Sequence, residues 1–407
     1  MLLNLERARA VMAERNLDAL VAASPENVTY ASGFANWTLY TFKDIEMYVV
    51  IPRDGELSLI AAIDASEYLA QCPVAPSRLY LYGTFHIERR PGAALAGAEA
   101  ALVAIRGGAI RQPNAATALR QALDDSGLSG SRIGLDDRGI TLSRWRATQE
   151  ALDNVVVEEA GDLFRRVRLI KTEPEIERLR YVVRVVEQGM LAAFEAATPG
   201  ITEWDLEAVF RTTVAAGGAI PGHFETSAGT RSAGCFPSSA EYRITQGDVI
   251  RSDAGGRYLG YWADTGRTAV LGQPPADLRR YYDALRRGID AICTQIKPGV
   301  SVGTLFETGV QTVREAGIPH YQRHHVGHSI GLEFYEPPIL VGQGGSNDIH
   351  RSSGADVFLE ENMVVNVELP YYELGLGGLQ IEDTLVVRAG GYERLNTADH
   401  ELRIYRD

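Results

Sequence analysis

Two aspartates in the segment RSDAGGRYLGYWADTGRT, residues 251–268, are spaced so that they could act on one group together. The segment has the pattern of two extended runs joined by a turn. A turn centred between Arg257 and Tyr258, or one residue further on, would place Asp253 directly opposite Asp264. Like charges directly opposite in a strand pair are destabilising. A folded protein that keeps this pair needs either a solvated strand edge or a positive group between the carboxylates.

The same arrangement occurs again near the C-terminus. The segment MVVNVELPYYELGLGGLQIEDTLVV, residues 363–387, predicts a hairpin folded around Gly375, which places Glu368 opposite Glu382. Either pair alone is equally compatible with a solvated strand edge. Four carboxylates facing one another inside a sheet, however, are strongly unfavourable unless they are protonated or neutralised. Two divalent cations carry the four positive charges that would balance them.

The segment between the two hairpins can supply a nitrogen ligand. In RHHVGHSIGLEFYEPP, residues 323–338, three histidines lie within five positions: His324, His325 and His328. A single histidine is most often a satisfied surface or core residue, but three in this place favour a ligand. Carboxylate oxygens together with one imidazole suit Mn²⁺, Co²⁺, Fe²⁺ or Zn²⁺ in a two-metal site.

The elements that position these residues belong to the second half of the chain. Short strand and helix patterns alternate up to about residue 155, and a long helix pattern then begins after Thr172 and continues to Pro199-Gly200. We therefore expect an N-terminal α/β domain, residues 1–165, and a catalytic domain, residues 166–407. Within the second domain, residues 199–218 and 298–317 align without a gap, and each predicts a capped helix.

Composition restricts the class of protein. The net charge of −13 and the pI near 5.2 argue against a nucleic-acid binder and against binding to an anionic membrane surface. Three scattered cysteines cannot form a disulfide framework. No stretch approaches the roughly 20 apolar residues of a membrane span, and the N-terminus lacks the pattern of a signal peptide. We expect a cytoplasmic protein with no membrane partner.

Three segments in this order resemble the pita-bread metallopeptidase family, which includes prolidase, aminopeptidase P, methionine aminopeptidase and the metal-free creatinase. They are SDAGGRYLGYWADTGRT, GHSIGLEFYEPP and VELPYYELGLGGLQIED. The resemblance covers residues 166–387, and the N-terminal half resembles the extra domain of the prolidase, aminopeptidase P and creatinase branch. It implies a C-terminal pita-bread domain with a curved antiparallel sheet. It also implies five metal ligands: Asp253, Asp264, His328, Glu368 and Glu382.

Around these ligands the sequence departs from the family. Two further histidines that contact substrate in the family's peptidases are replaced here by Phe236 and Tyr335. Gln380 stands where prolidases often have an arginine that can pair with a substrate carboxylate, and Gly266 replaces a threonine. Phenylalanine cannot move a proton, and losing a general acid costs on the order of 10² to 10⁴ in rate. The metal ligands are kept while the substrate contacts change, which favours changed chemistry or substrate.

The resemblance nevertheless predicts a dinuclear metal-dependent hydrolase of the Xaa-Pro dipeptidase or aminopeptidase P type, acting on a short peptide. Glu368 is the expected general base, and Tyr335 and His324 would steady the carbonyl oxygen or the leaving group. Phe236 and Gln380 would line the substrate pocket. One alternative is a small-molecule enzyme of the same fold, either an amide or amidine hydrolase like ectoine hydrolase or a C–S lyase acting on dimethylsulfoniopropionate. Another is a non-catalytic protein that keeps the metals for stability.

Relatives with this architecture are commonly dimers in which the partner's N-terminal domain helps to cover the active site. The aromatic segment NWTLYTFKDIEMY, residues 36–48, makes Trp37 and Tyr40 candidates to close that pocket, although ordinary core aromatics are the simpler interpretation. We therefore expect a homodimer.

Overall fold

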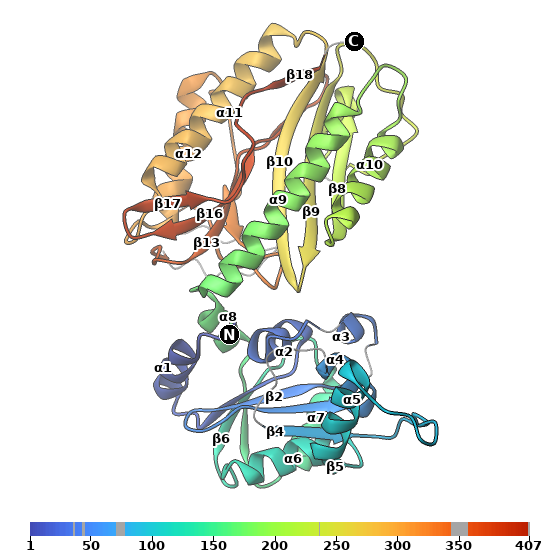
Figure 1. Ribbon diagram of the computed structural model, residues 1–407. Helices are drawn as coiled ribbons and strands as arrows, with labels where there is room; N and C mark the ends of the chain where they lie inside the picture. The colour runs from blue at the N-terminus through green and yellow to red at the C-terminus, as the bar shows by residue number, and fades with distance from the viewer. Residues whose placement is uncertain (36, 43–44, 71–77, 236, 343–356, 406–407) are drawn as a thin grey trace. The chain divides into compact units, whose positions relative to one another are not determined.

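The computed structural model describes residues 1–35, 37–42, 45–70, 78–235, 237–342 and 357–405. It divides into two compact units, Met1–Arg168 and Leu169–Asp407 (Figure 1). Both units combine helices with sheets, so the predicted α/β fold is confirmed.

The first unit is built on a seven-stranded mixed sheet with the strand order β5-β4-β3-β2-β1-β6-β7. Strands β1 and β2 are antiparallel, as are β2 and β3, and the remaining neighbours are parallel. The strands are β1 (Ala19–Ala22), β2 (Tyr48–Pro52), β3 (Ser58–Ala62), β4 (Arg78–Tyr82), β5 (Ile110–Gln112), β6 (Arg132–Leu135) and β7 (Val156–Glu159).

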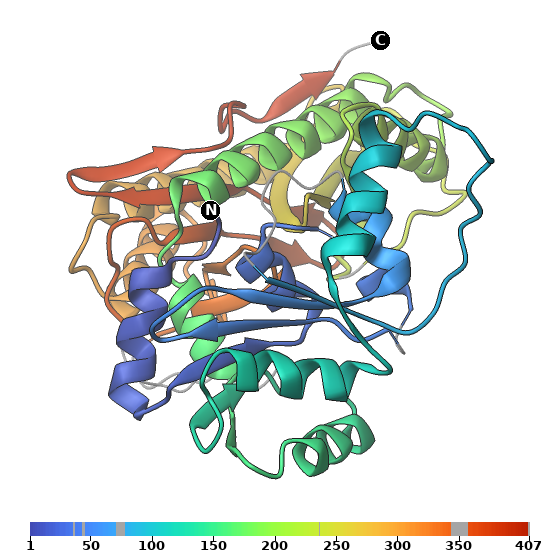
Figure 2. The ribbon, with the colours of Figure 1, turned by 60° about the horizontal axis from the view of Figure 1, so that its bottom comes forward.

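Helices cover this sheet (Figure 2). They are α1 (Leu5–Arg15), α2 (Pro25–Ser32), α3 (Trp37–Thr41), α4 (Ser66–Leu69), α5 (Gly97–Gly108), α6 (Ala115–Asp125), α7 (Leu142–Ala151) and α8 (Gly161–Arg168), with a 3-10 turn at Ile63–Ala65. The apolar face of α6 packs on β2, β3 and β4, and β1 contributes to the same buried core. Because side chains alternate along a strand, Ala19 and Val21 belong to this core, while the equally buried Leu20 and Ala22 face the other side.

The second unit is built on a nine-stranded, strongly curved sheet (Figure 1). Seven strands follow the order β12-β11-β13-β16-β10-β9-β8, β17 pairs with β16, and β18 pairs with β10. All pairs are antiparallel except that of β10 with β18. The strands are β8 (Ile220–Ala228), β9 (Val249–Tyr258), β10 (Tyr261–Leu271), β11 (Gly327–Ser329), β12 (Glu336–Ile339), β13 (Val364–Glu368), β16 (Glu382–Arg388), β17 (Gly391–Arg394) and β18 (Arg403–Tyr405).

Four long helices pack against this sheet: α9 (Glu173–Glu195), α10 (Glu203–Ala216), α11 (Ala276–Gln295) and α12 (Val302–Ala316). Helices α9 and α10 contact each other and the strands β8, β9 and β10, while α11 and α12 contact each other and share a core with β13 and β16. A 3-10 turn, η2 (Gly229–Ala233), follows β8, and a two-stranded ribbon of β14 (Tyr371–Glu373) and β15 (Gly377–Leu379) extends the last hairpin.

The local signals that predicted these helices are present in the structure. Thr172 and Glu175 form a capping box at the start of α9. The two segments that align with each other begin helices capped by Thr202 and Ser301, whose side-chain oxygens accept from the backbone N–H three residues on.

A search of the described residues finds no helix with the length and apolar character that a membrane span requires.

Candidate metal centre

The first predicted hairpin is formed by β9 and β10, but its register differs from the prediction. Leu259 and Gly260 make a two-residue turn with positive φ angles of 46° and 92°, as turns of the I′ class require. Asp253 therefore pairs with Gly266 and Asp264 with Gly255, so the prediction that the two aspartates lie directly opposite each other is wrong. The turn lies further along the chain than predicted. The residue opposite Asp253 is Gly266, two residues after Asp264. Because side chains alternate along a strand, this shift of two residues leaves both carboxylates on one face of the sheet.

The second predicted hairpin has the expected register. Glu368 on β13 lies directly opposite Glu382 on β16. On one side of this pair, β11 places His328 opposite Asn366, and on the other side Glu382 lies beside Gly266 of β10. Five neighbouring strands thus bring the five predicted ligands to one part of the sheet.

The side-chain atoms form two overlapping groups, each small enough to hold one ion. In the first, ligand atoms of Asp264, His328 and Glu382 lie within 4.8 Å of one another; in the second, those of His223, Asp253 and Asp264 do. Asp264 belongs to both groups. His328 Nε2 is 3.5 Å from Asp264 Oδ2.

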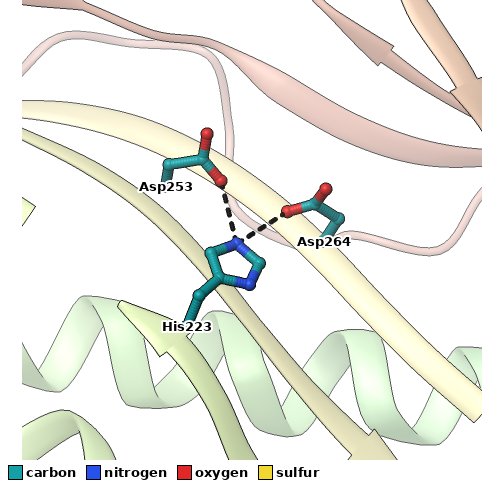
Figure 3. A group of neighbouring side chains, drawn as sticks. All are labelled: His223, Asp253 and Asp264. Atoms are coloured by element: carbon teal, nitrogen blue, oxygen red, sulfur yellow. Dashed lines mark hydrogen bonds and ion pairs between the residues drawn. The ribbon is translucent and has the colours of Figure 1, made fainter. Parts of the chain in front are cut away.

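From the sequence alone, strand packing is the favoured interpretation of His223 and a position facing the cleft is the weaker one, but the structure places its ring in the cluster. Its Nε2 lies 3.2 Å from Asp253 Oδ1 and 3.3 Å from Asp264 Oδ1 (Figure 3). An irregularity in the pairing of β8 with β9, between Pro221 and Phe224, sets the local direction of His223. No feature of the amino-acid pattern announces such a bulge, so the sequence carries no clear signal for this contact.

Glu368 has a histidine neighbour of its own, and it is not the one predicted. His325 Nε2 lies 2.5 Å from Glu368 Oε1, and Arg323 Nη2 lies 3.5 Å from the same oxygen. His324 is exposed, with its ring edge-on to that of His325. Strand alternation would place His324 on the same face as His328, but the chain bends at residues 324 and 326 before β11 begins. The catalytic role of His324 stays a prediction, and His325 is the residue beside the carboxylates.

Tyr335 lies in the cluster as a protonated phenol. Its ring stacks on His328 with a centroid distance of 3.8 Å and meets His325 edge-on. Burial, and after it the nearby carboxylate of Glu368, raises the pKa of Tyr335 far above its usual range. At neutral pH the hydroxyl therefore keeps its proton and is a hydrogen-bond donor.

Gln380 contacts the ligands themselves. Its Nε2 donates to Asp253 Oδ2 at 2.9 Å and to Glu382 Oε2 at 2.8 Å. Gly266 makes room for it, because a Cβ at that position would lie 2.4 Å from Gln380 Cγ. Gln380 Oε1 accepts from the buried Arg251 at 2.8 Å. Its predicted contact with substrate stays a prediction.

The structure does not test the roles of the remaining predicted residues. Phe236 lies outside the described residues. Trp37 and Tyr40 belong to α3 in the first unit, where Tyr40 is half-buried. Their role in closing a pocket stays a prediction.

The cluster has far more negative than positive protein charge. Of its four carboxylates, only Glu368 has a lysine or arginine nitrogen within 4.0 Å among the described residues. Burial, followed by repulsion from Asp264, raises the pKa of Asp253 and holds that of Glu382 well above its usual range. Burial also opposes ionisation of Asp264 and Glu368, but the neighbouring imidazoles of His223 and His328 lower the pKa of Asp264, and His325 lowers that of Glu368 to about 2.

These donors fit divalent metal ions. Buried carboxylates without enough cationic partners are costly, and cations bound between them would remove that cost. His328 also meets the usual requirement for a metal-binding imidazole. Its Nδ1 lies 2.9 Å from the Ser329 carbonyl oxygen, so a proton on Nδ1 is accepted there and the lone pair of Nε2 is left for an ion.

Comparisons with known proteins agree with this geometry. Residues 177–389 match metallopeptidase family M24, and residues 4–170 match the creatinase/prolidase N-terminal domain. An Xaa-Pro dipeptidase of Pyrococcus furiosus is 30% identical over 247 residues, which are 60% of this chain and 68% of that protein. An Xaa-Pro dipeptidase of Lactobacillus delbrueckii subsp. lactis is 23% identical over 406 residues, 99% of each chain.

Among solved structures, dipeptidase PepE from Mycobacterium ulcerans superposes with a TM-score of 0.75 at 22% identity, covering 99% of this chain and 97% of that one. This likeness shows that the fold extends over both units. Together with the matched segments, it confirms the predicted pita-bread fold and the creatinase-like N-terminal domain. The chain belongs to metallopeptidase family M24.

Proposed function

We propose that this protein is a two-metal Xaa-Pro dipeptidase. The observation that carries the proposal is that five neighbouring strands bring together the five predicted ligands, with Asp264 in reach of ligand atoms on both of its sides. Two adjacent metal positions are the arrangement that two-metal hydrolases use. Relatives named Xaa-Pro dipeptidase support the substrate class.

The five predicted ligands would hold the ions: Asp253, Asp264, His328, Glu368 and Glu382. Their oxygen-rich set with imidazole nitrogen suits Mn²⁺, Co²⁺, Fe²⁺ or Zn²⁺. When bound, such ions supply Lewis acidity, which lowers the pKa of water and polarises a carbonyl group.

Glu368 is the general base of the proposal, and His325 lies beside it. Glu368 Oε1 can take a proton during attack, and His325 Nε2, 2.5 Å away, holds the carboxylate in position. The lowered pKa of Glu368 leaves its carboxylate ionised at neutral pH. The role predicted for His324, to steady the carbonyl oxygen or the leaving group, stays a prediction.

The Tyr335 hydroxyl would act as a hydrogen-bond donor. Because its hydroxyl stays protonated, it can donate to the oxygen on which charge develops. With an unperturbed pKa near 10, against about 6.5 for histidine, it is a poorer proton donor than the residue it replaces. The missing histidine is therefore replaced more fully for electrostatic stabilisation than for proton transfer.

Arg251 favours a substrate with a free carboxylate. The side chain is fully buried, and its Nη1 contacts Gln380 Oε1 and the Tyr372 hydroxyl, while Nη2 donates to the carbonyl oxygens of Gly234 and Cys235. Among the described residues no carboxylate oxygen lies within 4.0 Å of it. A buried cation without an anionic partner is costly, and the terminal carboxylate of a dipeptide would supply one.

The test is hydrolysis by the metal-loaded protein of Gly-Pro, Ala-Pro, Gly-Pro amide and an Xaa-Pro-Xaa tripeptide, with ectoine beside them. We expect cleavage of the two dipeptides and at least roughly 10-fold slower cleavage of the amide, the size of one charge-assisted contact. An Arg251→Met variant should lose this preference. Equal rates for the acid and the amide would contradict the role of Arg251, and inertness towards every peptide would contradict the proposal.

The relatives do not favour the alternative small-molecule hydrolase or C–S lyase, and cleavage of ectoine alone would be the result that revives the former. A homodimer and a cytoplasmic location remain part of the proposal. Sedimentation of the metal-loaded protein would test the dimer.

A further inference from the structure

We propose that His223 is a sixth protein ligand, which completes the metal position between Asp253 and Asp264. The inference rests on the proposed two-metal function and adds to it a nitrogen ligand from β8 that the predicted set of five lacks. It gives each position the same composition: one imidazole, the shared Asp264 and one further carboxylate.

The distances around His223 Nε2 are those of ligands on a common ion. Donor atoms about 2.1 Å from an ion and separated by an angle of roughly 100° are about 3.2 Å apart. Nε2 is 3.2 Å from Asp253 Oδ1 and 3.3 Å from Asp264 Oδ1, and the side chains converge from different strands (Figure 3).

Hydrogen bonding alone accounts poorly for this contact. An imidazole Nε2 carries a single proton, which can point at one oxygen. Here two carboxylate oxygens lie at nearly equal distances from it. A cation bound by all three atoms uses the lone pair of Nε2 and neutralises both carboxylates.

The position of the ring is built into the fold. Gly255, directly across the sheet from Asp264, leaves space for it, because a Cβ at that position would lie 2.2 Å from His223 Cε1. Phe334 packs edge-on against the ring, with centroids 5.0 Å apart and planes at 88°. The bulge between Pro221 and Phe224 lies on the same stretch of β8.

This position is also the more open of the two. The side chains of His223 and Asp253 are 24% and 19% exposed, whereas that of His328 is 1% exposed. We therefore expect removal of His223 to weaken the ion that exchanges more readily and to leave the other in place. Imidazole favours Zn²⁺ and Co²⁺ over Mn²⁺, so the loss should be larger for the first two metals.

The test compares His223→Asn with wild type and with His86→Asn, which removes an exposed histidine of the first unit. Metal content after dialysis, calorimetric titration with Zn²⁺ and with Mn²⁺, and the absorption spectrum of the Co²⁺-loaded protein are measured. We expect two ions per chain in wild type and in the control. In His223→Asn one ion should bind roughly 10- to 100-fold more weakly, with a larger loss for Zn²⁺ than for Mn²⁺ and an altered Co²⁺ spectrum.

Two ions bound with unchanged affinities and an unchanged Co²⁺ spectrum in His223→Asn would overturn the inference and leave the proposed function intact. Fewer than two ions in wild type would overturn the two-metal function itself. A second variant, His223→Ser, measured alongside and checked by its melting temperature, separates a lost ligand from a disturbed fold.

Discussion

Two adjacent carboxylates on β16 have the same burial and opposite surroundings. Glu382 and Asp383 are 1% and 0% exposed and point to opposite faces of the strand. Asp383 is contacted by three basic side chains: Arg267 Nη2 at 2.6 Å, Arg394 Nε at 2.5 Å and His400 Nε2 at 2.6 Å. Glu382 has Gln380 as an amide donor, and its nearest charged groups are other carboxylates.

The electrostatics follow from this difference. Burial raises the pKa of both groups, but Arg267 and its neighbours reverse the effect and lower the pKa of Asp383. For Glu382, repulsion from Asp264 adds to burial and raises the pKa further. On the face of β16 that carries Asp383, basic side chains of the protein balance the carboxylate. On the face that carries Glu382, the balancing positive charge has to come from ions in solution. This difference separates a carboxylate that stabilises the fold from one that is available for a ligand.

The largest effect should come from removing the carboxylate shared by both ligand groups. Asp264→Asn should lose both ions and lower the rate of Xaa-Pro hydrolysis by more than roughly 100-fold, because even partners of metal ligands typically cost 10- to 100-fold. Metal analysis and steady-state kinetics with Gly-Pro measure this. Full metal content in the variant would contradict the assignment of Asp264 to both ligand groups.

On the other face, Asp383→Asn should destabilise the fold whether or not metal is present. Removing one partner of a buried ion pair costs roughly 3–5 kcal/mol, here because Arg267 loses its closest carboxylate. Urea unfolding with and without a chelator measures the difference. A loss of stability that appears only in the metal-loaded protein would contradict the structural role of Asp383.

The same substitution predicts a pH dependence. The folded pKa of Asp383 is lowered, so its contribution is fully present above the unfolded value of about 3.9 and is lost as the pH falls towards the folded value. The stability difference between wild type and Asp383→Asn should therefore shrink below about pH 4. A difference that stays constant down to pH 3 would show that packing, rather than charge, dominates.

A smaller effect of opposite sign is expected for Glu382→Gln. In the chelated protein this change removes a charge that its neighbours repel, and it should raise stability by on the order of 1 kcal/mol. With metal present it should lower stability, because a ligand is lost. If the variant is less stable under both conditions, hydrogen bonding at Glu382 outweighs repulsion.

An effect of about the same size should follow from Gly266→Ala. The added methyl group would displace Gln380 from its contacts with Asp253 and Glu382, and we expect metal affinity to fall about 10-fold. Gln380→Ala should have a similar effect, and the double variant should lose little more, because both changes remove the same contacts. Gly390→Ala, where a Cβ meets no atom within 4 Å, is the matched control.

Local patterns in the sequence were sufficient to predict the two-part α/β fold, the capped helices and the second hairpin. The acidic residues of the two hairpins predicted a cluster of carboxylates that needs counter-charges, although only Glu368 and Glu382 lie directly opposite each other. The predicted register of the first hairpin was wrong, because Leu259 adopts a positive φ that residues other than glycine rarely take.

The histidines could not be assigned in the same way. His223 depends on a β-bulge, and His325 depends on bends that interrupt alternation before β11. Both features arise from tertiary packing, so no spacing rule within either segment would have found them. The sequence also did not predict that Gly266 leaves the space that Gln380 fills. These residues are 114 positions apart and meet only because β10 pairs with β16.

The turn at Leu259 and Gly260 has a consequence for how the chain tolerates changes in length. Inserting or deleting a single residue there would shift the pairing of β10 by one residue. Asp264 and every later side chain of β10 would then point to the opposite face of the sheet. The ribbon between β14 and β15 ends instead at Leu374, which is 91% exposed, and extra residues at its tip need not alter the strands behind it. A peptide tag or a reporter domain therefore belongs at Leu374, while the shorter turn must keep its two residues.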